Sequence, residues 1–256
     1  MTLEDDIAAM FRLDGRVAIV TGASSGLGHR FSRVLAAAGA QVVAAARRAD
    51  RLDALAEECG AIAVRCDVTE ASDVERLVAT TVERFGRVDV LVNNAGITAA
   101  IPAEDEPLDT FRAVVDLNVT ALFHVTQLVG RQMLTQGSGS VINIASVAGL
   151  VAASPLKQAS YTASKGAVVN LTRELAVQWA RRGVRVNAIG PGFFPSEITQ
   201  VMLDDERTMA WVASNAPIPR FGLEHELDGV LLFLASDASS YCTGQTIVVD
   251  GGWTAR

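Results

Sequence analysis

The sequence contains few cysteines, and none of them are paired. Cys59, Cys66 and Cys242 are the three cysteines among 256 residues, and they form no C-x-x-C pair. This pattern argues against a disulfide framework and suits a reducing compartment. The three histidines are scattered, without cysteine or carboxylate partners at ligand spacing, so we expect no catalytic metal.

Basic charge and long apolar runs are also scarce. The 22 Lys and Arg residues are outnumbered by 29 Asp and Glu residues, and the formal net charge of −7 weighs against nucleic acid as a partner. No apolar run reaches the roughly 18 residues that a membrane span requires. The first ten residues, MTLEDDIAAM, lack the basic and apolar regions of a signal peptide. We therefore expect a soluble cytoplasmic protein without a membrane partner.

Linkers, internal repeats and low-complexity tracts are absent as well. Half of the residues are hydrophobic and 20% are charged, which is enough apolar material for one sizeable core. We predict a single domain over residues 1–256, with residues 1–12 as a short N-terminal extension.

Short β-branched runs alternate with helical stretches along the chain. The runs are apolar on both faces, as expected for strands of a parallel sheet that helices cover on both sides. Helical patterns include 27–39, 71–86 and 161–183, each with glycine at or just before the point where a helix should end. The pattern predicts an α/β fold, a Rossmann-like doubly wound parallel sheet of about seven strands with helices on both faces. The predicted strands are 16–21, 41–46, 61–66, 88–93, 140–145, 184–189 and 246–250.

A glycine-rich loop follows the first predicted strand and opens the first helix. The stretch TGASSGLG (21–28) places Gly22, Gly26 and Gly28 in a G-x-x-x-G-x-G pattern. Glycines let the backbone turn sharply and approach a pyrophosphate, whose charge is met by free N–H groups at a helix N-terminus. The position of the loop between a strand and a helix predicts nucleotide binding.

Further motifs occur in a characteristic order. NNAG (93–96) ends the fourth strand, YTASK (161–165) carries Y-x-x-x-K, GPG (190–192) follows the sixth strand, and TGQTIVVDGG (243–252) closes the chain. Together with TGASSGLG, these motifs make the chain resemble the classical short-chain dehydrogenase/reductase (SDR) family over about its whole length. The resemblance implies an oxidoreductase that interconverts a ketone and a secondary alcohol with a nicotinamide cofactor.

The resemblance implies four catalytic residues. Tyr161 matches the general acid/base, which must reach the carbonyl oxygen. Lys165, one helical turn later, would hold the nicotinamide ribose and favour the phenolate, so we expect it to lower the pKa of Tyr161. Ser146 would stabilise charge on the substrate oxygen, or simply cap a turn. Asn118 would hold a water with its backbone, the alternative being a satisfied core amide.

The resemblance also places cofactor contacts at several loops. Asp67 would bind the adenine amino group, and Ser196 stands where relatives often hold the carboxamide. Asn93 either packs against adenosine or braces strands. The predicted contacts are Gly22, Ser24, Ser25, Gly26, Leu27, Gly28, Arg47, Arg48, Asp67, Val68, Asn94, Ala95, Gly96, Tyr161, Lys165, Pro191, Gly192 and Ser196.

The end of the second strand predicts NADP(H) rather than NAD(H). A fold that prefers NAD places an acidic residue there to bind the ribose 2′-hydroxyl, but this chain has Ala46. Arg47 and Arg48 follow, and a guanidinium matches a phosphate with a planar fork of donors. We expect a preference for NADP of about 10–100-fold. The alternative is that the two arginines are simply solvated, Arg48 more so than Arg47.

Other functions stay open at this point. An NAD-dependent sugar-acid or polyol dehydrogenase and a 3-oxoacyl thioester reductase belong to the same family, and a non-catalytic nucleotide-sensing protein is a remote alternative. Val177 stands where carrier-dependent reductases present a basic residue, which disfavours a carrier-bound substrate. Ser146 and Tyr161 are 15 positions apart where many relatives have 13, so the substrate pocket is expected to differ.

Two long helical segments predict self-association. Residues 109–135 and 159–181 carry apolar side chains on more than one face, and such a helix needs a second surface to bury. In the family these helices pair with their copies across a two-fold axis. We expect a homo-oligomer, a tetramer.

Overall fold

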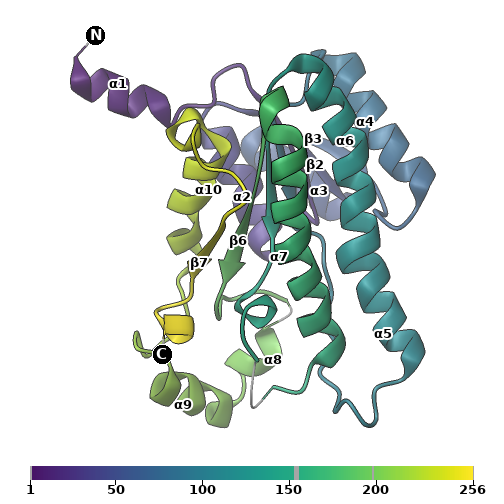
Figure 1. Cartoon of the computed structure of the whole chain (residues 1–256), viewed down its shortest axis with the longest axis vertical. Helices are drawn as coiled ribbons and strands as arrows, with labels where there is room; N and C mark the ends of the chain where they lie inside the picture. The colour runs from purple at the N-terminus through teal and green to yellow at the C-terminus, as the bar shows by residue number, and fades with distance from the viewer. Residues whose placement is uncertain (1, 153–155, 198, 256) are drawn as a thin grey trace.

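Seven parallel strands form the centre of the molecule (Figure 1). The computed structural model describes residues 2–152, 156–197 and 199–255, and the order of its strands is β3-β2-β1-β4-β5-β6-β7. The predicted doubly wound sheet is confirmed, and each strand lies within two residues of its expected position. The strands are β1 (Val17–Thr21), β2 (Gln41–Ala46), β3 (Ile62–Arg65), β4 (Val90–Asn93), β5 (Gly139–Ile144), β6 (Val184–Pro191) and β7 (Thr246–Val249).

Helices cover both faces of this sheet (Figure 1). One face packs against α2 (Gly26–Ala37), α3 (Ala49–Cys59) and α10 (Asp228–Ala235). The other face packs against α4 (Ala71–Phe85), α6 (Leu122–Gln136) and α7 (Ala159–Trp179). The remaining α-helices among the described residues are α1 (Leu3–Met10), α5 (Leu108–Val115), α8 (Gln200–Leu203) and α9 (Glu206–Asn215).

The strands contribute to the hydrophobic cores on both faces of the sheet, because their side chains alternate between the two faces. In β1, Ala18 and Val20 belong to the cluster under α2 and α10, whereas Ile19 between them belongs to the cluster under α4 and α6. All five residues of β1 are buried. A strand covered on both faces has no position for a solvated side chain, which explains the continuous apolar runs in the sequence.

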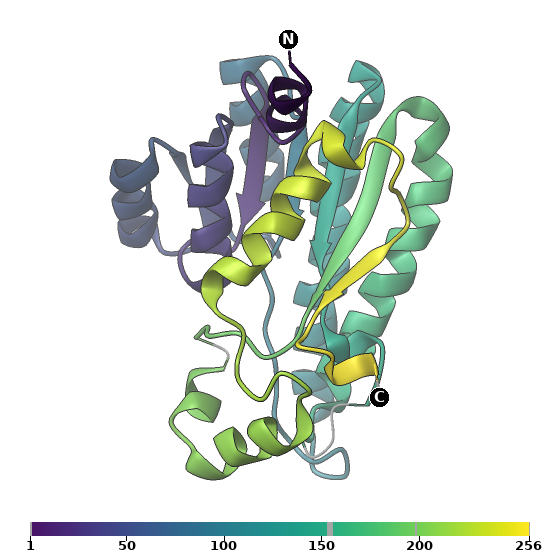
Figure 2. The same ribbon diagram turned by 90° about the vertical axis from the view of Figure 1, so that its left-hand side faces the viewer.

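The strand order creates a topological switch point beside β1. The chain proceeds from β1 outward to β2 and β3, and then returns to place β4 on the other side of β1. The loops that follow β1 and β4 therefore diverge at the carboxyl edge of the sheet, which is where open α/β sheets bind ligands. Helices α8 and α9 lie beyond this same edge (Figure 2).

A long helical stretch joins α5 to α6 through a π-helical segment, Asp116–Ala121. By length and composition, one stretch of the described residues, Leu108–Gln136, is long and apolar enough to cross a membrane. The sequence-based expectation that no segment would reach this length was wrong. Val125, Val129 and Met133 of this stretch are buried against the sheet, and a core helix needs such an apolar face.

The first helix stands apart from the rest of the fold. Helix α1 projects from the body of the molecule (Figure 1), and none of its eight described residues is buried. Its acidic residues Glu4 and Asp5 lie in the first turn, where they suit the positive end of the helix dipole. The predicted N-terminal extension is thus a short helix that adds little to the core.

Candidate active site

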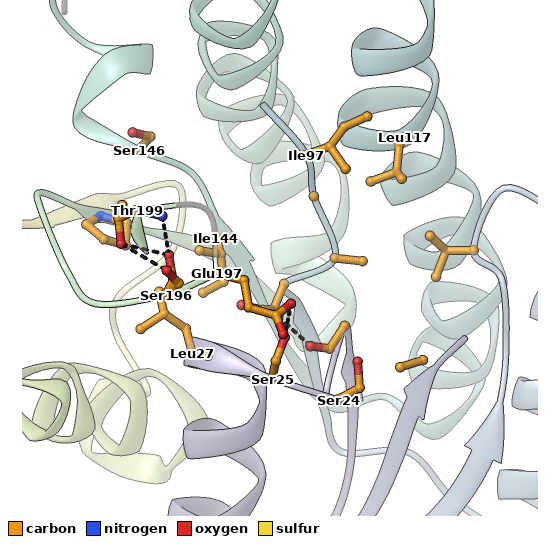
Figure 3. Close-up of a pocket in the computed structure, with 18 of the residues that line it drawn as sticks. Ser24, Ser25, Leu27, Ile97, Leu117, Ile144, Ser146, Ser196, Glu197 and Thr199 are labelled. Atoms are coloured by element: carbon orange, nitrogen blue, oxygen red, sulfur yellow. Dashed lines mark hydrogen bonds between the residues drawn. The ribbon is translucent and has the colours of Figure 1, made fainter. Parts of the chain in front are cut away.

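A cavity of about 480 Å³ opens at the carboxyl edge of the sheet. Figure 3 shows Ser146 at one end of it and Ser24 and Ser25 at the other. The lining includes the predicted site residues except Gly28 and Asn118. The two parts of the site predicted from separate motifs therefore meet in one space.

The glycine loop after β1 forms the floor of this cavity. Gly22 and Gly26 have φ angles of +65° and +51°, which other residues rarely adopt. A Cβ at Gly28 would lie 2.4 Å from the Gly22 carbonyl oxygen and from Nδ2 of Asn94. Gly28 therefore lets α2 pack closely on the loop and does not itself line the cavity. Asn94 fixes the loop from the other side by donating to the carbonyls of Thr21 and Gly22.

Tyr161 and Lys165 project from the first turns of α7 toward the end of β5. The Lys165 side chain is buried, its Nζ donates to the Ile144 carbonyl at 2.7 Å, and it lies 5.6 Å from the centre of the Tyr161 ring. A Cβ at Gly149 would lie 2.6 Å from the Lys165 backbone. Glycine at this position lets the turn that carries Ser146 approach α7 closely enough to bring the three side chains together.

Burial dominates the pKa values of this pair. Burial raises the pKa of Tyr161, and the hydrogen bond with Ser146 offsets part of that rise. Burial also lowers the pKa of Lys165 to about 8. The expectation that Lys165 lowers the pKa of Tyr161 was wrong for this structure, because loss of water disfavours both the phenolate and the ammonium that would stabilise it.

Ser146 caps a turn and also lines the cavity. Its Oγ accepts a hydrogen bond from the Ala148 N–H at 3.1 Å and so caps the short 3-10 turn Val147–Gly149. The same side chain is hydrogen-bonded to Tyr161. The capping bond fixes the direction of the hydroxyl, and the side chain lines the cavity. The two added positions between Ser146 and Tyr161 fall within 147–160, of which 153–155 lie outside the described residues.

Asn118 lies behind the cavity in the π-helical segment. Its amide is fully buried, accepts from the Ile97 N–H and donates to the Ile97 carbonyl, both at 2.9 Å, and donates to Ser164 Oγ at 3.0 Å. The side chain is therefore a satisfied core amide that ties the loop after β4 to α7. A π-helical turn alters the backbone hydrogen-bond pattern and often marks a functional site.

Asn93 braces strands. Its Nδ2 donates to Thr126 Oγ1 at 2.7 Å and to Asn143 Oδ1 at 2.9 Å, and Asn143 donates in turn to Thr172. This buried chain of hydrogen bonds links β4, β5, α6 and α7. Of the two roles that the sequence left open, the structure shows the bracing one.

The two arginines after β2 differ in their surroundings. The Arg47 side chain is 68% exposed and lies 4.0 Å from the Asp67 carboxylate. Arg48 donates to Ser24 Oγ at 3.0 and 3.1 Å and to Ser25 Oγ at 2.7 Å, and it is the less exposed of the two. Arg48, the arginine for which solvation seemed the better interpretation, is thus the one held against the glycine loop.

Sequence reasoning missed several lining residues. Glu197 accepts from both Arg48 and Arg51, and Thr199 Oγ1 lies 3.0 Å from Ser196 Oγ. These residues follow β6 outside any motif, so only the folded loop reveals them. The other lining residues to which the sequence assigned no role at the site are Cys66, Ile97, Leu117, Ile144, Ala145 and Phe194.

The described part of the chain contains no candidate metal-binding site. Within residues 2–152, 156–197 and 199–255, no three His, Cys, Asp or Glu side chains are grouped so that they could hold a metal ion. The charged groups that do line the cavity there are Arg47, Arg48, Asp67, Lys165 and Glu197.

Comparison with known proteins agrees with the motifs. A family model described as Enoyl-(Acyl carrier protein) reductase matches residues 22–254. The chain is 40% identical to a galactitol 2-dehydrogenase (L-tagatose-forming) of Cereibacter sphaeroides, over 97% of this chain and 99% of that protein. It is 42% identical to a 3-oxoacyl-[acyl-carrier-protein] reductase of Synechocystis, over 95% and 98% of the two chains.

The structure has close counterparts as well. The crystal structure of a gluconate 5-dehydrogenase from Burkholderia cenocepacia, in complex with NADP and tartrate, matches with a TM-score of 0.93 and 38% identity, over 98% of this chain and 99% of that one. The likeness in sequence and in fold thus extends over nearly the whole chain. The protein belongs to the short-chain dehydrogenase/reductase family and is an oxidoreductase that acts on CH–OH and C=O groups with a nicotinamide cofactor.

Proposed function

We propose that the protein is an NADP(H)-dependent oxidoreductase that interconverts a ketone and a secondary alcohol, with Tyr161 as the general acid and base. The observation that carries this proposal is the meeting of Ser146, Tyr161 and Lys165 in one cavity with the glycine loop. The residues present fit a dinucleotide, since the loop glycines keep the floor of the cavity open and Arg47 and Arg48 lie at its far end.

The proton step follows from the environment of Tyr161. When bound, the nicotinamide supplies or accepts the hydride at the substrate carbon. Because burial raises the pKa of Tyr161, the phenol keeps its proton at neutral pH and is ready to donate it to a carbonyl oxygen. Ser146, hydrogen-bonded to the phenol, stabilises the charge that develops on the same oxygen. In the oxidative direction the phenol must first lose its proton, so oxidation is favoured by high pH.

Lys165 and Asn118 assist the proton transfer by Tyr161. The bond from Lys165 Nζ to the Ile144 carbonyl holds the amine between the end of β5 and Tyr161. With a pKa of about 8, Lys165 can exchange a proton near neutral pH and can pass it toward the phenol. The backbone at Asn118 would hold the water that continues this relay, while its side chain keeps α7 in place through Ser164.

The substrate end of the cavity favours a small, uncharged carbonyl compound or alcohol. Tyr161 lines the cavity and packs against an apolar cluster of Val147, Ala148 and Trp253, in which the Phe193 and Trp253 ring centres are 5.4 Å apart. Of the described cavity residues, only Lys165 is cationic at this end, and one of its N–H donors is bonded to the Ile144 carbonyl. An uncharged ketone or secondary alcohol therefore suits these surroundings better than a sugar acid does.

A carrier-bound 3-oxoacyl thioester is the second candidate, since one of the relatives above is a reductase of that kind. Val177 stands 80% exposed on α7 where a basic residue would attract an acidic carrier, which weakens this candidate. A panel of polyols, sugar acids, diketones and 3-oxoacyl thioesters, followed by nicotinamide absorbance with either cofactor, separates the two. Efficient turnover of the thioester with sluggish turnover of the free compounds would reverse the ranking.

The proposal also includes the oligomeric state of the protein and its cellular location. Leu108, Phe123 and Val177 are exposed on α5, α6 and α7, and these apolar side chains suit a contact with a second copy of the chain. We expect a cytoplasmic homotetramer that folds as one domain. Light scattering at micromolar concentration tests the assembly, and a monomer there would contradict it.

A further inference from the structure

Glu197 reaches from the loop after β6 into a cluster of hydrogen-bond donors. Figure 3 shows its carboxylate directed at Ser25, with a hydrogen bond between them. Two arginines complete the surroundings of the carboxylate. We call Ser24, Ser25, Arg48 and Arg51 the anion cluster.

The contacts of the carboxylate are those of a well-bound anion. Arg48 binds it with a fork, Nη1 to Oε1 at 2.9 Å and Nη2 to Oε2 at 3.0 Å. Ser25 Oγ donates to Oε2 at 2.9 Å, and Arg51 Nη1 donates to Oε1 at 3.0 Å. The hydrogen bond with Arg48 lowers the pKa of Glu197, which keeps the carboxylate ionised at neutral pH. A planar fork with an added hydroxyl suits a phosphate as well as a carboxylate.

The anion cluster occupies the place where a dinucleotide fold puts the adenosine ribose. Ser24 and Ser25 belong to the glycine loop, and Arg48 is the second residue after β2, which ends at Ala46. Donors at that place that face the cavity would meet the 2′-phosphate of NADP(H). Each N–H of Arg48 that binds Glu197 is then an N–H that the phosphate needs. Two anions brought to the same donors would also repel each other.

We propose that the carboxylate of Glu197 and the 2′-phosphate of NADP(H) are alternative occupants of the anion cluster, so that Glu197 sets the strength of the preference for NADP(H). NADP(H) must displace the carboxylate, whereas NAD(H) leaves it in place. Glu197 thereby takes part in cofactor discrimination from the loop after β6, through its contacts with Arg48 near the end of β2. The inference rests on the proposed function only in assigning the ribose to this end of the cavity.

The test compares Glu197→Gln with wild type in the binding of two probes, 2′,5′-ADP and 5′-AMP, by calorimetry. Glutamine keeps the size of the side chain and removes its charge. We expect 2′,5′-ADP to bind about 3- to 10-fold more tightly to the variant, the range for losing two half-exposed ion pairs. Binding of 5′-AMP should stay within about twofold of wild type. Glu206→Gln, an exposed position at the start of α9, is the matched control and should change neither.

Three results would overturn the inference. Weaker binding of 2′,5′-ADP to Glu197→Gln would mean that Glu197 positions Arg48 for the phosphate. Weaker binding of 5′-AMP alone would mean that Glu197 forms a hydrogen bond with the ribose hydroxyl. Equal affinity of wild type and both variants for 2′,5′-ADP would mean that the cluster holds no phosphate. The readout uses no turnover, so failure of the proposed reaction would appear separately, as absent hydride transfer with normal binding of both probes.

Discussion

At one end of the cavity the reactive groups are buried and held by regular elements, whereas at the other end the charged groups are half exposed and held by one another. Lys165 is 5% exposed and bonded to a strand carbonyl, and Ser146 is fixed by a backbone N–H. Arg48 and Glu197 are 39% and 52% exposed and meet as an ion pair. Burial amplifies electrostatic effects and solvent screens them. Substitutions at the first end should therefore have large effects that salt does not alter, and those at the second end moderate effects that salt reduces.

Apart from Tyr161→Phe, the largest difference should come from Lys165→Ala. Removal of the amine takes away both the charge next to Tyr161 and the group that would hold the nicotinamide ribose. We expect the rate of hydride transfer to fall by about 10²–10³-fold and cofactor affinity to fall with it. Stopped-flow absorbance and cofactor titration measure the two effects. Loss of affinity without loss of rate would show that Lys165 only binds the cofactor.

The buried amine of Lys165 should also make the free energy of unfolding depend on pH. A comparison of the wild type with Lys165→Met tests this. The lysine is protonated in the unfolded chain up to its ordinary pKa of 10.5, but in the folded chain it loses its proton near pH 8. Between these values the unfolded chain binds more protons, so the free energy of unfolding gains with rising pH. The full gain is about 3 kcal/mol.

Urea unfolding of both proteins across this pH window measures the effect. The wild type should gain stability relative to Lys165→Met as the pH rises above 8, and Tyr161 is present in both and contributes equally. Parallel pH profiles would mean that the amine is not buried as the structure has it.

At the exposed end, Ala46→Asp combined with Arg47→Ala should swing the cofactor preference toward NAD. The new carboxylate can bind a ribose hydroxyl and repels a 2′-phosphate, so the wild-type preference of about 10–100-fold should be lost or reversed. Arg48→Ala alone should cost more NADP affinity than Arg47→Ala alone, because Arg48 contacts Ser24 and Ser25 and Arg47 is mostly solvated.

Ratios of kcat/KM for the two cofactors, at low and high salt, check both statements. Arg33→Ala, an exposed arginine paired with Glu58 outside the cavity lining, is the control. Equal or better efficiency of the wild type with NAD would show that these arginines do not bind the 2′-phosphate.

A further test at the buried end concerns how the turn with Ser146 is placed. Gly149→Ala adds a methyl group 2.6 Å from the Lys165 backbone, so the turn or α7 must move, at a cost of about 1–3 kcal/mol. Gly229→Ala, in α10 with nothing within 4 Å of the added atom, should be neutral or slightly stabilising. The thermal unfolding and the turnover rate of Gly149→Ala should be compared with those of Gly229→Ala. Unchanged turnover of Gly149→Ala would show that the function of Ser146 does not depend on the close approach of its turn to α7.

The same contrast explains what the sequence could predict. The buried elements were predicted well, because a strand covered on both faces, as β1 is, must be apolar throughout and a glycine loop must follow it. The catalytic residues lie on such elements, at the start of α7 and the end of β5, so their motifs located them.

The exposed end was predicted less well, because ion pairs depend on loops that meet only in the folded chain. Glu197 is separated from Arg48 by 149 positions, and nothing in its local sequence distinguishes it from the other acidic residues of that region. The pKa of Tyr161 was predicted in the wrong direction for a related reason. The spacing of Tyr161 and Lys165 shows that the two are neighbours, but it does not show how much water the fold removes from both.

The most direct test of the central claim is a single-turnover measurement of hydride transfer in Tyr161→Phe, with the best carbonyl substrate from the panel. Phenylalanine keeps the ring against the apolar wall and removes the acidic proton. We expect NADPH to bind as in wild type while the rate of hydride transfer falls by about 10²–10⁴-fold. Full turnover by Tyr161→Phe would contradict it.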